Sequence, residues 1–201
     1  MPAGTLATIL RDRTIRTVLN LRGPNPAADW YRRERAAALD SGVTQVDIPL
    51  SSCVWMSRLQ LRTLLDVLDH AEYPMLVHCH WGSERTGLTA AVAELLRPGG
   101  TLADARGQLA LRFLYVRLGD GRIMAEFLDQ YETWLASRGL EHSPDVFRGW
   151  ARGGYVPGRP NREEWPYDPT PLVVITRPGA AGQGPTPGEP IAASSSPAER
   201  R

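Results

Sequence analysis

The feature that most constrains this sequence is a cysteine placed between an expected strand and an expected helix. The apolar run of residues 74–77 predicts a buried strand, and residues 88–96 predict an apolar helix. Cys79 follows the strand directly, and Arg85 comes six positions later. The backbone N–H groups that open a helix bind anions, and an arginine fork binds two phosphate oxygens at once. The segment therefore predicts an anion-binding loop whose positive potential makes Cys79 a nucleophilic thiolate.

This segment resembles the signature of the cysteine-dependent protein tyrosine phosphatases, His-Cys, five residues, then Arg-Thr/Ser-Gly. It is most similar to the small and atypical dual-specificity members, including bacterial ones. A buried structural cysteine is the alternative interpretation, but it leaves the rest of the motif unexplained. The resemblance covers roughly residues 14–135 and implies a phosphatase. The matching residues are His78, Cys79, Gly82, Arg85, Thr86 and Gly87.

Strands and helices alternate along the first half of the chain. Ser57 and Gln60 have the spacing of a capping box, which marks a helix start. The alternation predicts an α/β domain with a mostly parallel central sheet, helices on both faces, and the signature loop between a strand and a helix. The expected strands are residues 15–21, 43–50 and 74–77, and the expected helices are residues 27–39, 58–70, 88–96, 101 to about 112, 123–135 and 144–150.

The chain divides by composition into a domain, residues 1–153, and a tail, residues 154–201. With 42% apolar and 22% charged residues, the 201-residue chain has the composition of a globular protein. Ten of the seventeen prolines follow Tyr155, together with Gly- and Ser-rich patches. Such a composition predicts a mostly disordered tail. Its one apolar island, residues 172–175, could instead add a strand to a partner or to the domain itself.

Charge and cysteine content exclude several classes of function. A net charge of +1 gives no bulk attraction to nucleic acids or acidic membranes. Two cysteines do not make a disulfide framework, and the sequence shows no signal peptide or long apolar run. The four histidines lack the spacing of metal ligands. We therefore expect a cytoplasmic protein that uses neither a metal nor another cofactor.

The resemblance implies a role for each residue of the loop. Cys79 attacks phosphorus and forms a phosphocysteine, which water then hydrolyses. Arg85 and the loop N–H groups hold the phosphate oxygens, which is how proteins catalyse phosphoryl transfer. The Thr86 hydroxyl assists departure of the sulfur, and His78 orders the loop. The expected phosphate- and substrate-contacting residues are His80, Trp81, Gly82, Ser83, Glu84 and Arg85.

The general acid is the point where this sequence departs from the family pattern. The family supplies an aspartate from the loop after the preceding strand, but Ser51 and Ser52 stand there. Asp47 lies at about the right sequence distance from Cys79, although it falls within the expected strand. Glu84 is the second candidate, because phosphatases of the myotubularin type carry an acidic residue before the loop arginine. The sequence leaves both candidates open.

The substrate is expected to be a phosphorylated protein or a small phosphate ester. Trp81 could form a flat wall for a phosphotyrosine ring. Inositol phosphates are a further possibility, but the loop lacks lysines, and Glu84 would repel polyanions. A pseudophosphatase that binds phosphorylated partners is the alternative to an enzyme. Arg22 either adds positive potential beside the loop or is an ordinary surface residue. Cys53 either protects an oxidised Cys79 as a second thiol or has no redox role.

Overall fold

The structure is a computed structural model that describes residues 3–162, 173–179 and 186–187. Its strands are β1 (Thr17–Asn20), β2 (Thr44–Asp47), β3 (Met75–His78), β4 (Val174–Thr176) and β5 (Thr186–Pro187). They form one sheet in the order β3-β1-β2-β4-β5. The first three strands are parallel, whereas β4 is antiparallel to β2 and β5 is antiparallel to β4. The expected α/β class with a mostly parallel sheet is confirmed.

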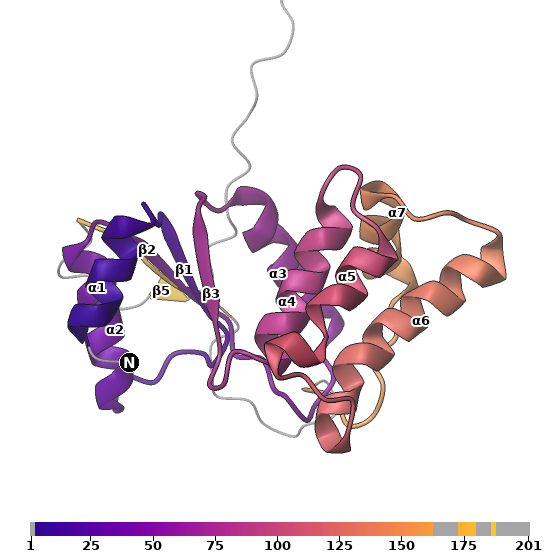
Figure 1. The fold of residues 1–201 in the computed structure, drawn as a ribbon, viewed down its shortest axis with the longest axis horizontal. Coiled ribbons are helices and arrows are strands. Elements are labelled where there is room, and N and C mark those ends of the chain that lie inside the picture. The colour runs from indigo at the N-terminus through magenta and orange to yellow at the C-terminus, as the bar shows by residue number, and fades with distance from the viewer. Residues whose placement is uncertain (1–2, 163–172, 180–185, 188–201) are drawn as a thin grey trace, which may run out of the picture.

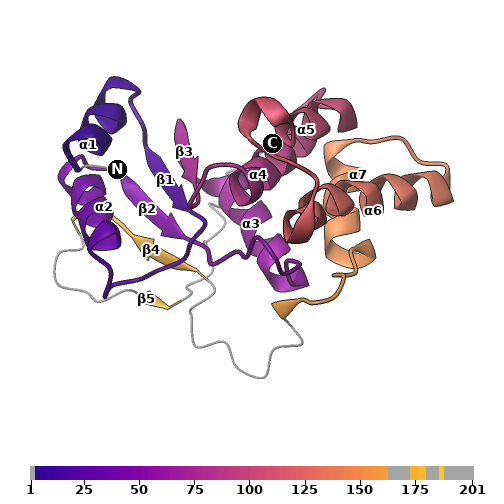
Figure 2. The same cartoon turned by 60° about the horizontal axis from the view of Figure 1, so that its bottom comes forward.

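Helices cover both faces of this sheet (Figure 1). One layer holds α1 and α2, the opposite layer holds α3 and α4, and α5, α6 and α7 pack beyond α4 (Figure 2). The helices are α1 (Ala3–Asp12), α2 (Asp29–Asp40), α3 (Arg58–His70), α4 (Glu84–Leu96), α5 (Leu102–Gln108), α6 (Ile123–Arg138) and α7 (Pro144–Gly149), with the short turns η1 (Leu111–Phe113), η2 (Gly119–Arg122) and η3 (Trp150–Gly154). The helix expected to reach about residue 112 ends at Gln108, and η1 follows it as a separate turn.

Strand β1 lies at the centre of the packing because its side chains alternate between two apolar layers. Val18 packs with Leu6 and Leu10 beneath α1 and α2, whereas Leu19 belongs to the larger core beneath α3 and α4. All four residues of β1 are buried. Full burial of such an aliphatic side chain contributes about 1.5–3 kcal/mol, so β1 is a rigid support for the strands on either side of it.

The capping box expected at Ser57 is present and helps to place the loop between β2 and α3. The Ser57 hydroxyl accepts from the Gln60 N–H at 3.0 Å, and the Gln60 side-chain oxygen accepts from the Ser57 N–H at 2.8 Å. The Gln60 side-chain nitrogen also donates to the Pro49 carbonyl at 2.8 Å. Both ends of the β2–α3 loop are therefore tied to the start of α3.

The chain remains packed on the domain beyond residue 153. The Tyr155 hydroxyl donates to the Met56 carbonyl at 2.8 Å, and the ring packs against Phe127 and Trp150. The Trp55 N–H then donates to the Pro160 carbonyl at 2.9 Å. Because these contacts bury aromatic surface, the segment up to residue 162 adds to the core rather than leaving it.

The second half of the apolar island at residues 172–175 lies in a strand of the domain. Val174–Thr176 is β4, with Val46 and Ile175 as Cα partners across the β2–β4 pair, and Val174 is buried. Of the two alternatives for this island, the structure contains the strand added to the domain itself. The other residues for which disorder is expected lie largely outside the described residues. Within the ranges described, no helix has both the length and the apolar character needed to cross a membrane.

Candidate active site

The loop that contains Cys79 curls around its own sulfur. It connects the end of β3 at His78 to the start of α4 at Glu84. Gly82 adopts a φ of 74°, a left-handed conformation that glycine takes without strain. This turn directs the Gly82 N–H at the Cys79 Sγ, 3.3 Å away. The sulfur therefore lies on a row of backbone donors at a helix N-terminus, as an anion does.

This environment lowers the pKa of Cys79. Burial alone would raise it, since the thiol side chain is only 7% exposed. The hydroxyl and N–H of Thr86, the N–H of Gly82 and the charge of Arg85 favour the thiolate and outweigh the burial. The structure thus brings together three sequence-predicted residues, Cys79, Thr86 and Arg85, around one sulfur. A thiolate is the form of cysteine that attacks phosphorus.

The guanidinium of Arg85 has a donor that is not used within the described residues. It lies in the first turn of α4, where one terminal nitrogen, Nη1, donates to the Leu50 carbonyl at 3.3 Å. The Nε atom is buried and has no hydrogen-bond partner among the described residues. A buried donor without an acceptor is costly, about 1–3 kcal/mol, unless a ligand supplies one. The loop and Arg85 together therefore provide donors for the oxygens of a tetrahedral anion.

His78 is fixed by a partner that sequence reasoning missed. Glu34, on α2, places Oε1 3.1 Å from the His78 Nε2, and the other ring nitrogen lies 3.3 Å from the Cys79 carbonyl oxygen. Burial alone would lower the pKa of His78, but Glu34 reverses the effect and the pKa is raised. A protonated His78 can donate through both nitrogens and so tie α2 to the backbone of Cys79. No sequence pattern would have placed Glu34 beside β3.

A cavity of about 350 Å³ opens beside Cys79 on the side of α1 and α2. Two of the expected substrate-contacting residues, His80 and Gly82, line it. Trp81 instead projects into solvent with 79% exposure, its ring edge-on to His80, and Ser83 is buried as the residue before α4. The other lining residues come mostly from outside the loop and are Leu6, Ile9, Arg22, Trp30, Arg33, Glu34, Leu76 and His78.

A comparison with protein families agrees with this geometry. Residues 3–100 match the family model described as "Tc-R-P: Polymorphic toxin system, DSP-PTPase phosphatase". Residues 3–100 are therefore similar to a DSP-PTPase phosphatase domain. No curated protein matches the sequence. The matched range contains the phosphatase loop, the three parallel strands and the cavity beside Cys79.

The first candidate general acid, Asp47, is enclosed. The residue is 0% exposed, and its carboxylate accepts from Asn20 at 2.8 Å, Gln45 at 2.9 Å and the Tyr31 hydroxyl at 2.6 Å. Burial raises its pKa, and the three donors only partly oppose the rise. Asp47 joins β2 to β1 and α2 and has no path to a substrate. This placement gives it a structural role and argues against proton donation to a leaving group.

The second candidate, Glu84, lies in the first turn of α4. Its carboxylate and Cγ lie against Gly121, where an added Cβ would meet Oε1 at 3.0 Å. Neither Glu84 nor Arg85 is among the described residues that line the cavity, and a carboxylate in the first turn of α4 is favoured by the helix dipole. Residues 48–57, which connect β2 to α3, contain no acidic residue. Cys53 in that loop is a free, exposed thiol whose sulfur lies 3.6 Å from the Ser51 hydroxyl.

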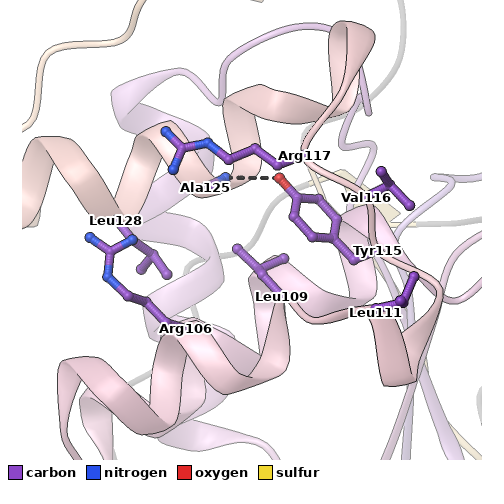
Figure 3. Close-up of a pocket in the computed structure, with 8 residues that line it drawn as sticks. All are labelled: Arg106, Leu109, Leu111, Tyr115, Val116, Arg117, Ala125 and Leu128. Carbon is purple, nitrogen blue, oxygen red and sulfur yellow. Dashed lines mark hydrogen bonds between the residues drawn. The ribbon is translucent and has the colours of Figure 1, made fainter.

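A second cavity, of about 400 Å³, lies between α5, α6 and the segment that joins them (Figure 3). Its polar groups are already engaged: Tyr115 donates to the Gly121 carbonyl and accepts from the Ala125 N–H, and Arg106 and Arg117 both pair with Asp129. The described residues that line it include no cysteine, serine or histidine. In the described part of the chain, moreover, no group of His, Cys, Asp and Glu side chains could hold a metal ion. The cavity beside Cys79 remains the candidate site.

Proposed function

We propose that this protein hydrolyses phosphate monoesters of phosphoproteins, phosphotyrosine among them, through a phosphocysteine on Cys79. The observation that carries the proposal is the pairing of a stabilised thiolate with an unsatisfied arginine. Cys79 has a lowered pKa and an N–H donor on its sulfur, and the buried Nε of Arg85 lacks an acceptor in the same loop. A phosphoryl group would be attacked by the first and held by the second.

The steps of the reaction follow from these groups. The Cys79 sulfur forms a bond to phosphorus as the bond to the alcohol or phenol oxygen breaks, and that oxygen leaves with the electron pair. Water then attacks the phosphocysteine, phosphate departs, and the electron pair returns to sulfur as thiolate. Thr86, whose hydroxyl stabilises the thiolate, assists this departure. Arg85 offsets the charge that builds on the phosphoryl oxygens in both steps.

The missing acid sets an expectation for the leaving group. Because Asp47 is enclosed and the Glu84 carboxylate lies against Gly121, we expect neither of them to protonate the departing oxygen. General acid catalysis contributes about two to four powers of ten. The enzyme should therefore favour activated aryl phosphates, and phosphotyrosine over phosphoserine, because better leaving groups need less protonation. The thiolate has to remain reduced, so we place the activity in a reducing cytoplasm.

A pseudophosphatase is the second candidate, and the lack of a placed general acid favours it. A loop that binds phosphate next to a carboxylate-free β2–α3 segment would suit a module that holds phosphorylated partners without releasing phosphate. The two candidates differ in whether a phosphocysteine forms and turns over.

The deciding experiment is turnover of a nitrophenyl phosphate and a phosphotyrosine peptide, with acid quenching to trap the intermediate. We expect steady turnover and a phosphate adduct on the peptide that contains Cys79, measured by mass spectrometry. The change Cys79→Ser should remove both, because serine is far less acidic than cysteine. The matched control is Cys53→Ser, which changes the exposed thiol and should leave both intact. Binding of the phosphopeptide without any adduct or turnover would identify the pseudophosphatase.

A further inference from the structure

Arg22 is a cation at the edge of the candidate site that has no anionic hydrogen-bond or ion-pair partner among the described residues. It follows β1, and its guanidinium carbon lies over the ring of Trp30, 3.4 Å from the ring centroid. In the described ranges its side chain has neither a hydrogen-bond acceptor nor an ion-pair partner. An arginine stacked on an aromatic face keeps its edge N–H groups free to bind a carboxylate or phosphate.

The backbone around Arg22 is fixed by the buried network of Asp47. Asn20 donates its side-chain N–H to Asp47 at 2.8 Å and to the Gly23 carbonyl at 3.1 Å, and its side-chain oxygen accepts from the Arg22 N–H at 3.0 Å. The ring beneath Arg22 is fixed by the same network, since Tyr31, next to Trp30 in α2, donates to Asp47 at 2.6 Å. The guanidinium and its aromatic platform are therefore held in place before a ligand arrives, which lowers the entropic cost of binding.

Arg22 faces the thiol cavity. It lines that cavity together with Cys79, His80 and Arg33, and it is close enough to Cys79 for the thiolate charge to act on it. Arg33 is exposed and adds a second cation to the rim. Glu34 is the one acidic residue among the described residues of the lining, and it is paired with His78. Glu84 is not among the described lining residues, and its carboxylate lies against Gly121.

We propose that Arg22 binds a second anionic group of the substrate, so that the site selects phosphopeptides with a carboxylate or a second phosphate on the residue next to the phosphorylated one. The inference rests on the proposed phosphatase site and specifies its substrate class. The phosphoryl group occupies the loop between Cys79 and Arg85, and the neighbouring anion lies across the cavity on the Arg22 fork. Bidentate binding of this kind distinguishes arginine from a diffuse positive potential.

The test measures binding, so that it does not depend on turnover. The Cys79→Ser protein is titrated calorimetrically at low salt with three phosphotyrosine peptides whose neighbouring residue is glutamine, glutamate or phosphoserine. We expect the glutamate peptide to bind about tenfold more tightly than the glutamine peptide, the ratio for one charged hydrogen-bonded contact. A still higher affinity for the phosphoserine peptide would show that phosphate is the preferred second group. An affinity no higher than that of the glutamate peptide would show that the preferred second group is a carboxylate.

Adding Arg22→Gln should bring the glutamate peptide to the affinity of the glutamine peptide. The matched control is Arg16→Gln, which removes the same charge before the other end of β1, where Arg16 pairs with Glu72; it should leave the tenfold ratio unchanged. Arg22→Lys keeps the charge but loses the fork, and a ratio of about threefold is expected.

Two outcomes overturn the inference: equal affinity of the starting protein for the glutamate and glutamine peptides, or a ratio that survives both substitutions of Arg22. Failure of the phosphatase function would appear separately, as absence of hydrolysis by the protein that retains Cys79.

Discussion

At the scale of the residue, the site depends on charges that are stabilised in pairs. The thiolate of Cys79 is stabilised by donors of its own loop, and the imidazolium of His78 by Glu34 on another element. Both members of the His78–Glu34 pair are largely buried, with side-chain exposures of 25% and 13%. Such a pair contributes to stability only while both groups are ionised.

The pH dependence of stability tests this pair. Because the pKa of His78 is raised in the folded protein, its contribution is full below the unfolded value of about 6.5 and is lost as the pH rises through the folded value. Glu34→Gln should therefore lower the free energy of unfolding by about 1–3 kcal/mol near pH 5.5 and by much less near pH 9. Urea unfolding across this range measures the difference.

The control is Glu72→Gln, which removes an exposed partner of Arg16, a cation that does not titrate in this range. Its effect should be small and the same at both pH values. An effect of Glu34→Gln that stays constant with pH would show that His78 is neutral throughout.

At the scale of the element, α2 is more important to the site than the sequence indicated. Tyr31 donates to Asp47, Glu34 pairs with His78, and Trp30 supports Arg22, so one helix fixes three strand ends. The sequence predicted the phosphatase loop because strand, glycine turn and helix are consecutive there. It could not place α2, since the register of a helix against a sheet depends on packing between distant segments. The same limit applies to Asp47, whose surroundings come from β1 and α2.

Substitution of the two carboxylates separates structural from catalytic roles. A general acid matters most for poor leaving groups, so its loss slows phosphotyrosine hydrolysis far more than nitrophenyl phosphate hydrolysis. We expect neither Asp47→Asn nor Glu84→Gln to show this dependence. Asp47→Asn should instead lower the free energy of unfolding by about 1–3 kcal/mol, since a buried amide cannot accept from all three donors.

The measurements are the ratio of kcat/KM for the two substrates and the midpoint of urea unfolding. General acids contribute about two powers of ten or more to the rate. A selective loss of kcat/KM of that size on the phosphotyrosine substrate would identify the substituted carboxylate as the acid.

At the scale of the whole molecule, the sheet is completed by a segment from far along the chain. Strand β4 covers the outer edge of β2, while β3, which leads into the phosphatase loop, forms the opposite edge of the sheet in the described residues. An uncovered strand edge presents unpaired backbone groups and invites association with other chains.

Truncation tests the role of β4. A chain ending at residue 162 lacks β4 and β5, whereas one ending at residue 187 keeps both and is the matched control. The shorter chain should lose about 2–3 kcal/mol, the value of burying one or two aliphatic side chains such as Val174, and should self-associate. Urea unfolding and light scattering measure both effects. Equal stability and equal mass for the two chains would show that the β2 edge needs no cover.

The pairing of Val46 with Ile175 also has a consequence for the growing chain on the ribosome. Strands β1, β2 and β3 and the loop of Cys79 are synthesised early. Strand β4, which pairs with the other edge of β2, emerges only after α7. At translation rates of about 5–20 residues per second, the nascent domain carries an unpaired β2 edge for on the order of ten seconds. During that interval the exposed edge can bind chaperones or pair with neighbouring nascent chains. Faster translation of the intervening helices would shorten the time for which the edge is exposed.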